Sequence, residues 1–241
     1  MVLRFFLLAV LFLFLSCTNF ERDNPNDPDG VNYQGGSQLL SSDSRPSSSS
    51  VQVVNVSCDM NYRTERIGDQ VWMAENLNCN VSGSKCYNNN ESNCATYGRL
   101  YDWATAMNLP ASCNSSSCAS QIKAKHQGIC PDGWHIPSDA ELTTLTDYVG
   151  GASTAGKYLK AESGWNSGGN GNDKYGFSAL PGGFGGSGGY FRDVGYYGYW
   201  WSATEYLSYF AYYRNVGYNY ELVHYYYDSK DCLYSVRCLQ D

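Results

Sequence analysis

Cysteine content constrains the fold of this chain more than any other feature of the sequence. The chain has ten cysteines, at positions 17, 58, 79, 86, 94, 113, 118, 130, 232 and 238. An exported protein meets oxidising surroundings, in which cysteines pair into disulfides. If the chain is exported, we therefore expect a loop-rich body that is braced by cross-links.

The N-terminal residues indicate export. Arg4 precedes an uninterrupted apolar run over residues 5–15, and Ser16 follows it. A positive charge, a short apolar core and a small residue are the successive parts of an export signal. The eleven apolar residues are fewer than the roughly 20 that a membrane-spanning helix needs. Residues 1–16 are therefore predicted to be a signal peptide that is removed.

Residues 13–17, Leu-Phe-Leu-Ser-Cys, resemble the bacterial lipoprotein signal, in which cleavage before the cysteine accompanies its acylation. The resemblance implies that Cys17 carries a lipid anchor and that the protein belongs to the cell envelope, at the outer membrane or the cell surface. Several acyl chains would hold it there stably, because each buried CH2 contributes about 0.8 kcal/mol. The alternative is an ordinary secretory signal with an incidental cysteine.

Composition divides the remaining chain in two. Residues 17–50 are rich in Asn, Asp, Pro and Ser and too poor in apolar groups to bury a core, so we expect a disordered tether. Residues 51–241 fit a single domain. The formal net charge of -7 argues against a nucleic-acid partner, because an acidic chain without a basic stripe repels phosphates.

Residue patterns within the domain predict helices first and strands last. Short strands are expected over residues 51–56 and 70–74, and a helix over residues 95–107. A second helix should begin at Ser138, which opens a capping box. From Phe177 onward, aromatic and β-branched residues are interrupted by glycines, a pattern typical of short antiparallel strands.

Six sequence blocks follow one another along the domain. They are IGDQVWMAENL (67–77), YGRLYDWA (97–104), CPDGWHIPS (130–138), YGFSALP (175–181), WSATE (201–205) and SVRC (235–238). Together they resemble the Fibrobacter succinogenes major paralogous domain family, a set of exported proteins and lipoproteins without an established activity. The resemblance supports the expected location and leaves the chemistry open.

A more distant similarity, over residues 133–141, is to the C-type-lectin-like fold and its formylglycine-generating-enzyme branch. It implies an α+β, C-type-lectin-like architecture in which two or three helices pack on small, twisted antiparallel sheets braced by disulfides. This agrees with the order of elements that the residue patterns predict.

Cysteine positions suggest three bridges. Cys86 and Cys94, like Cys113 and Cys118, enclose short polar loops that packing alone would not hold, so local bridges are expected. A bridge from Cys130 to Cys238 would close the domain end to end and contribute about 4 to 5 kcal/mol. The pairing of the remaining domain cysteines stays open, and their number is odd; they are Cys58, Cys79 and Cys232.

An alternative use of the late cysteines is catalytic. The resemblance to formylglycine-generating enzymes raises the possibility that Cys232 and Cys238 form a redox or copper-binding pair. Their spacing and flanking residues differ from that family's pattern. On one straight strand they would also lie about 20 Å apart, so only a bend could bring them together.

The loop over residues 165–173 concentrates amide, carbonyl and carboxylate oxygens, the ligands that Ca2+ prefers. We take Trp165, Asn172 and Asp173 as candidate binding residues and 166–173 as a candidate calcium loop. Only Asp173 is charged, and the sugar motif of calcium-dependent lectins is absent. The favoured interpretation is therefore a turn-rich loop, with no metal or other cofactor in the protein.

Aromatic residues dominate the stretch from residue 190 to residue 227. Strand alternation would place about half of these rings on the surface. The candidate binding residues are Tyr196, Tyr197, Tyr199 and Trp200, whereas Trp201 is assigned to the core. Exposed tyrosine and tryptophan suit binding to sugars and proteins; the alternative is that these rings form cross-strand pairs that stabilise a small sheet.

We therefore expect a surface-anchored, non-catalytic binding module, with a glycan or an envelope protein as its partner and the membrane reached through the lipid anchor. One alternative is an oxidase that uses the late cysteines. Another is a structural envelope protein without a ligand site.

Overall fold

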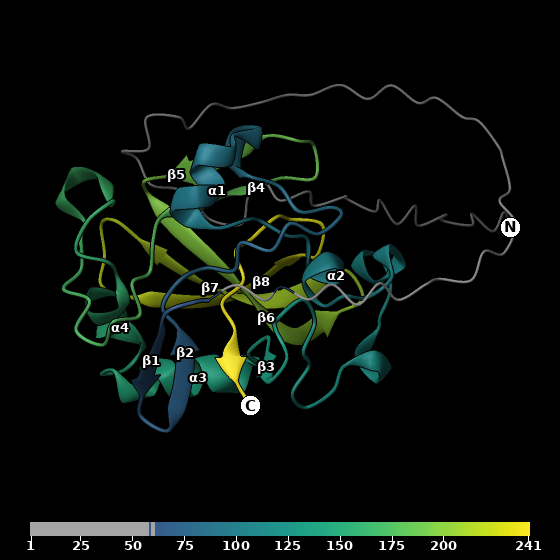
Figure 1. Cartoon of the computed structure of the whole chain (residues 1–241), viewed down its shortest axis with the longest axis horizontal. Coiled ribbons are helices and arrows are strands. Elements are labelled where there is room, and N and C mark those ends of the chain that lie inside the picture. Colours follow the sequence, from purple (N-terminus) through teal and green to yellow (C-terminus); the bar gives the residue numbers. More distant parts are fainter. Residues whose placement is uncertain (1–57, 59–60) are drawn as a thin grey trace, which may run out of the picture. The chain divides into compact units, whose positions relative to one another are not determined.

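The computed structural model describes Cys58 and residues 61–241 (Figure 1). Four predictions lie outside the described residues: the signal peptide, the lipidation of Cys17, the tether over residues 17–50 and the strand over 51–56. No helix in the described part of the chain is long and apolar enough to cross a membrane.

The first sheet joins the beginning and the end of the described body. Its strand order is β1 (Thr64–Ile67), β2 (Gln70–Met73), β9 (Leu239–Gln240) and β3 (Trp134–His135). All its pairings are antiparallel, and Figure 1 shows the last strand lying between β2 and β3. The C-terminal strand therefore holds together segments that are distant in sequence.

A charged side-chain cluster fastens this last strand. The ring of His135 is buried, with Nδ1 2.7 Å from Oδ1 of Asp241 and Nε2 3.1 Å from Oε1 of Glu141. Burial lowers the pKa of His135, but the hydrogen bonds to the two carboxylates outweigh it and raise the pKa above its usual value. Glu141 is also the capping-box residue of the following helix, so one carboxylate serves both the helix start and the sheet.

The second sheet has five strands in the order β5 (Phe191–Val194), β4 (Gly182–Gly185), β6 (Tyr197–Leu207), β7 (Phe210–Gly217) and β8 (Val223–Ser229). The pairings are antiparallel except between β4 and β6, which are parallel. The predicted β-rich second half is thus present. β6 is the central strand of this sheet, and β8 lies at one edge.

Four α-helices lie before this sheet in the described chain: α1 (Glu91–Tyr97), α2 (Trp103–Ala106), α3 (Asp139–Tyr148) and α4 (Ala152–Leu159). Short 3-10 turns occupy Tyr87–Asn89, Ala111–Asn114, Ala119–Gln121 and Asn166–Gly168. The capping box at Ser138 is present as predicted. α3 packs on β6 and β7, and α4 packs on β8.

The single helix predicted over residues 95–107 is wrong. The chain forms α1, an extended stretch that pairs through Leu100 and Tyr101, and then α2. The break occurs at Gly98, which has a φ of 78° and lies so close to Asn76 that a Cβ would come within 2.8 Å of that residue's Cβ. Long-range packing at this glycine therefore overrides the helical pattern of the sequence.

Two clusters of buried side chains fill opposite faces of β6. Trp201 belongs to the cluster that contains Trp103, Tyr234 and most of the cysteines. The neighbouring residue, Trp200, points to the other side and joins the cluster under α3 and α4. The α+β class and the disulfide bracing are as predicted, while the C-type-lectin-like assignment and the domain boundaries stay predictions.

Candidate functional site

Exposed aromatic side chains gather on one part of the second sheet. Among the described residues, the large hydrophobic side chains that are exposed are Tyr148, Tyr206, Leu207, Tyr209, Tyr225, Tyr226 and Tyr227. All of these except Tyr148 belong to β6, β8 or the turn between β6 and β7. Such a concentration of exposed rings on a rigid sheet marks a candidate binding surface.

Five aromatic rings of this part of the sheet, three exposed and two half-buried, share one face. β7 and β8 pair Tyr212 with Tyr227, and directly opposite side chains share a face of the sheet, as do residues two apart, here Phe210 and Tyr225. The ring of Tyr206 stacks on that of Tyr227, with centroids 4.0 Å apart, and lies 5.3 Å from Tyr212. We call these five residues the tyrosine platform.

A buried arginine fastens the platform to a helix. Arg214 follows Tyr212 on the same face of β7 and donates hydrogen bonds to the carboxylate and carbonyl of Asp139 and to the hydroxyl of Thr143. Its guanidinium also lies 5.6 Å from the centre of the Tyr225 ring. Because Asp139 balances the charge of Arg214, the platform offers ring faces and hydroxyl groups rather than an unpaired cation.

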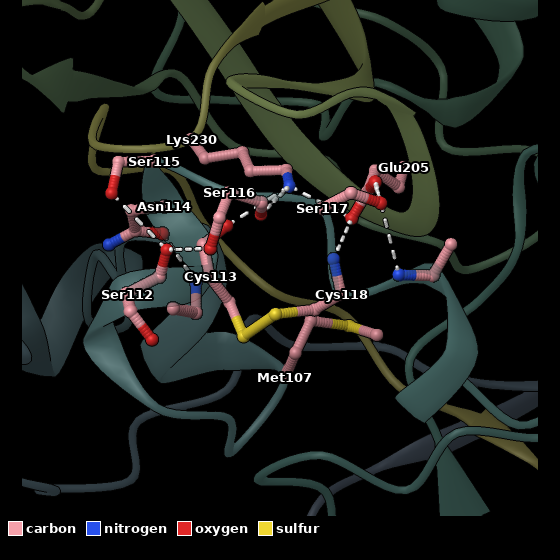
Figure 2. The surroundings of a disulfide bond; sticks show 12 residues. Met107, Ser112, Cys113, Asn114, Ser115, Ser116, Ser117, Cys118, Glu205 and Lys230 are labelled. Carbon is pink, nitrogen blue, oxygen red and sulfur yellow. Dashed lines mark hydrogen bonds and ion pairs between the residues drawn. A yellow bond between two sulfur atoms is a disulfide. The ribbon is translucent and has the colours of Figure 1, made fainter.

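A buried ammonium group fixes the hairpin that carries Tyr206. Lys230 is fully buried, and its Nζ donates to the carbonyl oxygens of Cys113 and Ser208, each at 3.0 Å, and to Glu205 at 2.9 Å. Figure 2 shows Lys230 and Glu205 directed toward the loop that the Cys113–Cys118 disulfide closes. The loop and the end of β6 are thus held by one charge cluster.

Glu205 has further partners in that cluster. Its carboxylate accepts hydrogen bonds from the hydroxyl of Ser117 and from the backbone N–H of Cys118. Burial raises the pKa of Glu205, but these donors and Lys230 outweigh the effect and lower it below its usual value. Burial lowers the pKa of Lys230, and its hydrogen bond to Glu205 opposes this effect. Both groups of the pair are thus hydrogen-bonded.

The prediction that Tyr199 lies on the surface is wrong, and Trp200, the candidate binding residue next to it, is buried too. Each is 4% exposed. The hydroxyl of Tyr199 donates to Asp193 at 2.6 Å, and Nε1 of Trp200 donates to Asn76 at 2.8 Å. Around these two residues both faces of β6 are covered by buried clusters, so alternation there chooses between two buried faces. Trp201 is fully buried, as predicted.

Tyr196 and Tyr197 are half-buried at the opposite end of β6 from Tyr206. Their rings pack against Tyr218, at centroid distances of 5.2 and 6.2 Å. These contacts fit the alternative that the sequence left open, in which the aromatic residues stabilise the sheet by pairing across strands.

In loop 165–173, two of the three candidate binding residues have partners within the protein. Trp165 is buried, and its Nε1 donates to the carbonyl of Ala179. Both carboxylate oxygens of Asp173 accept from Ser178, at 2.7 and 2.6 Å, while Asn172 is exposed. The loop's one carboxylate thus stabilises its own turn, and the calcium site stays a prediction.

The described residues contain one group of side chains close enough together to hold a metal ion, namely Cys86, Glu91 and Cys94. The two cysteines are bonded to each other, so their sulfurs are not thiolate ligands. This group therefore offers no metal site while the bridge is intact.

The three predicted disulfides are present: Cys86–Cys94, Cys113–Cys118 and Cys130–Cys238. The structure adds a fourth, Cys58–Cys79, which the sequence left open. Cys232 is disulfide-bonded as well. Neither Cys232 nor Cys238 is a thiol in this structure, so the dithiol that the oxidase alternative requires is not assembled.

The sequence blocks meet in the core. The guanidinium of Arg237 is fully buried, donates to Oδ1 of Asn76 and to the carbonyl of Phe177, and stacks 4.2 Å from the centre of the Phe177 ring. Asn76 in turn donates to the carbonyl of Tyr97 at 2.9 Å. Burial lowers the pKa of Arg237 to about 9. Four of the six blocks are thus joined by one buried network.

A family model described as the Fibrobacter succinogenes major domain matches residues 66–240. The chain belongs to this family. No curated protein and no solved structure matches it. In this Fibrobacter major domain the sequence blocks build the core, whereas the five platform residues lie outside all six blocks. Family membership therefore accounts for the fold and leaves the platform to be explained.

The sequence reasoning named the aromatic stretch but chose the wrong members of it. The platform residues that it missed are Tyr206, Phe210, Tyr212, Tyr225 and Tyr227. A usable signal was present in Tyr225 to Tyr227, three consecutive tyrosines in one strand. Whichever face such a strand buries, at least one of the three rings must point the other way.

Proposed function

We propose that this Fibrobacter major domain binds a neutral glycan on the tyrosine platform and is held at the cell envelope through a lipid anchor on Cys17. The observation that carries the proposal is the set of exposed rings on one face of the sheet: Tyr206, Tyr225 and Tyr227 are 39%, 64% and 49% exposed, and Tyr206 stacks on Tyr227. A contiguous group of exposed rings is typical of an interaction site, because leaving such apolar surface in water is costly.

Tyrosine suits a sugar ligand for physical reasons. The ring face packs on the apolar C–H face of a sugar ring, and the phenol hydroxyl can exchange hydrogen bonds with sugar hydroxyls. Tyrosine also loses little conformational entropy on binding. Here the rings are fixed further by mutual stacking and by the attachment of β7 to α3 through Arg214, so little ordering remains to be done when a ligand arrives.

The charge of the chain and of the surroundings of the platform favours neutral glycans over acidic ones. Arg214, which lies beside the platform, is neutralised by Asp139, and the chain carries a formal net charge of -7. An acidic polysaccharide would meet repulsion without a compensating cation. A neutral polysaccharide avoids this cost, and so the neutral class is the one we propose.

Binding to neutral and acidic oligosaccharide panels tests the proposal, with calorimetric titration of any ligand found. Replacing Tyr227 or Tyr225 with Ala should weaken binding by at least about tenfold, or about 1.4 kcal/mol. The matched control is Tyr148→Ala, at a tyrosine that is 56% exposed on α3 and outside the platform; it should leave affinity unchanged.

Two results would overturn the proposal. One is the absence of binding to every neutral glycan in the panel, with capture of an envelope protein instead. The other is glycan binding that the platform variants do not affect. Tyr199→Ala and Trp200→Ala are unsuitable probes, because both side chains are buried and their loss would disturb the fold.

The anchor is tested separately. Metabolic labelling with a fatty-acid analogue should mark the wild-type protein and leave Cys17→Ser unlabelled. Labelling of the Cys17→Ser variant at the same level would refute the anchor without bearing on the platform.

A further inference from the structure

Among the strands of the described residues, β8 is an edge strand without the usual protection. The two described sheets end in β1, β3, β5 and β8. The first three have two or four residues each, and β1 and β5 carry exposed charges at Glu65, Arg66 and Arg192. Short length and charge are the means by which proteins prevent edge strands from pairing with other chains.

In contrast, β8 has seven residues, and its one formally charged side chain is Asp228. Within the described part of the chain, β7 is the one strand that pairs with it. Its central residues are open to solvent: Tyr225, Tyr226 and Tyr227 are each about half exposed or more. The outer side of β8 therefore presents backbone N–H and C=O groups to a further strand.

The sequence of β8 is complementary to itself in the antiparallel direction. If Tyr226 lies opposite Tyr226 of a second copy, Tyr225 lies opposite Tyr227, and His224 lies opposite Asp228. Aromatic pairs stabilise adjacent strands, and a histidine N–H would add to the donors that the Asp228 carboxylate already has in Tyr234 and the backbone of Ser229. A register centred on one residue is also what a two-fold axis requires.

We propose that two copies of this chain associate through β8, antiparallel and centred on Tyr226, so that their five-stranded sheets become one continuous sheet. The two-fold axis is perpendicular to the sheet and keeps both tyrosine platforms on the same side. With strands about 4.8 Å apart, Tyr227 of one copy lies beside Tyr225 of the other. The two platforms then form one continuous aromatic surface.

The pairing does not depend on the glycan proposal, because its central side chain points away from the platform. Tyr226 alternates with Tyr225 and Tyr227 along β8 and therefore lies on the opposite face, where its ring stacks with that of His224. A change at Tyr226 can abolish pairing while leaving each platform intact.

Substitutions of Tyr226 by residues of opposite charge test the pairing of two β8 strands. Two copies of the full chain with different affinity tags are co-expressed in an exporting bacterium, extracted in mild detergent and purified through one tag. Wild-type copies should co-purify. Co-purification should fall by at least about tenfold when both copies carry Tyr226→Lys, or both carry Tyr226→Glu, because like charges then face each other across the strands. One copy of each kind should restore it.

The same exchanges at Tyr148, an exposed tyrosine on α3, form the matched control and should leave co-purification unchanged. The proposal fails if wild-type copies do not co-purify, or if the three combinations at Tyr226 behave alike. Restoration by the mixed pair would show that each variant folds. Glycan affinity per chain, measured on the Tyr226→Lys protein, separates failure of the pairing from failure of the platform.

Discussion

Removing the buried ammonium of Lys230 should be among the most damaging single changes in this domain. Lys230→Met keeps the length and packing of the side chain but leaves the Glu205 carboxylate, 7% exposed, without its cation. The carbonyls of Cys113 and Ser208 lose their donor as well. Breaking one partner of a buried ion pair costs about 3 to 5 kcal/mol, or a fall in Tm of about 6 to 20 °C for a domain of this size.

Thermal unfolding followed by circular dichroism, with disulfides kept oxidised, measures this loss. The double variant Lys230→Met/Glu205→Gln should recover part of it, because a neutral amide is cheaper to bury than an unpaired carboxylate. Lys157→Met is the control: its ion pair with Glu221 is about half exposed and should cost less than about 1 kcal/mol. If Lys230→Met were as mild as this control, or the double variant showed no recovery, the interpretation of the cluster would be refuted.

Three further predictions concern the rest of the fold. Because the pKa of His135 is raised in the folded protein, protonated His135 stabilises the fold fully below the unfolded pKa, and this stabilisation is lost as pH rises through the folded pKa. Urea unfolding of wild type and His135→Gln between about pH 5 and 9 should show their free energies of unfolding converging at high pH. A difference that stays constant with pH would contradict the prediction. The Cys130–Cys238 bridge has a sequence separation of 108 and the Cys113–Cys118 bridge one of 5. Removing the first should lower the free energy of unfolding in denaturant by about 5 kcal/mol, and removing the second by about 2 kcal/mol. Equal losses would argue against loop closure as the cause. Gly98 and Gly133 share a φ of 78°, but a Cβ would clash at Gly98 and meet nothing within 4 Å at Gly133. Gly98→Ala should therefore be less stable than Gly133→Ala by about 1 to 3 kcal/mol. Equal melting temperatures of the two variants would disprove the close approach at Gly98.

Features with a local cause were predictable from the sequence. The Cys86–Cys94 and Cys113–Cys118 bridges each close a loop too short and polar to be held otherwise, and the capping box at Ser138 involves residues within one helical turn. The six blocks also identified the family, because their side chains and backbone build a common core.

Features with a distant cause were not predictable in this way. The helical pattern over residues 95–107 is divided at Gly98 by contact with Asn76, and the alternation along β6 misplaced Tyr199. Alternation shows which side chains share a face, but it does not show whether that face is covered.

The sequence by itself determined the family of this protein and the bridges that close its short loops, because both depend on residue identity and close spacing. The prediction of export also comes from the sequence alone. The tertiary structure decided which tyrosines reach solvent. It packed α3 and the cysteine-rich loops against the two faces of β6 and left β8 at an edge, and burial of a ring depends on what other segments bring to it.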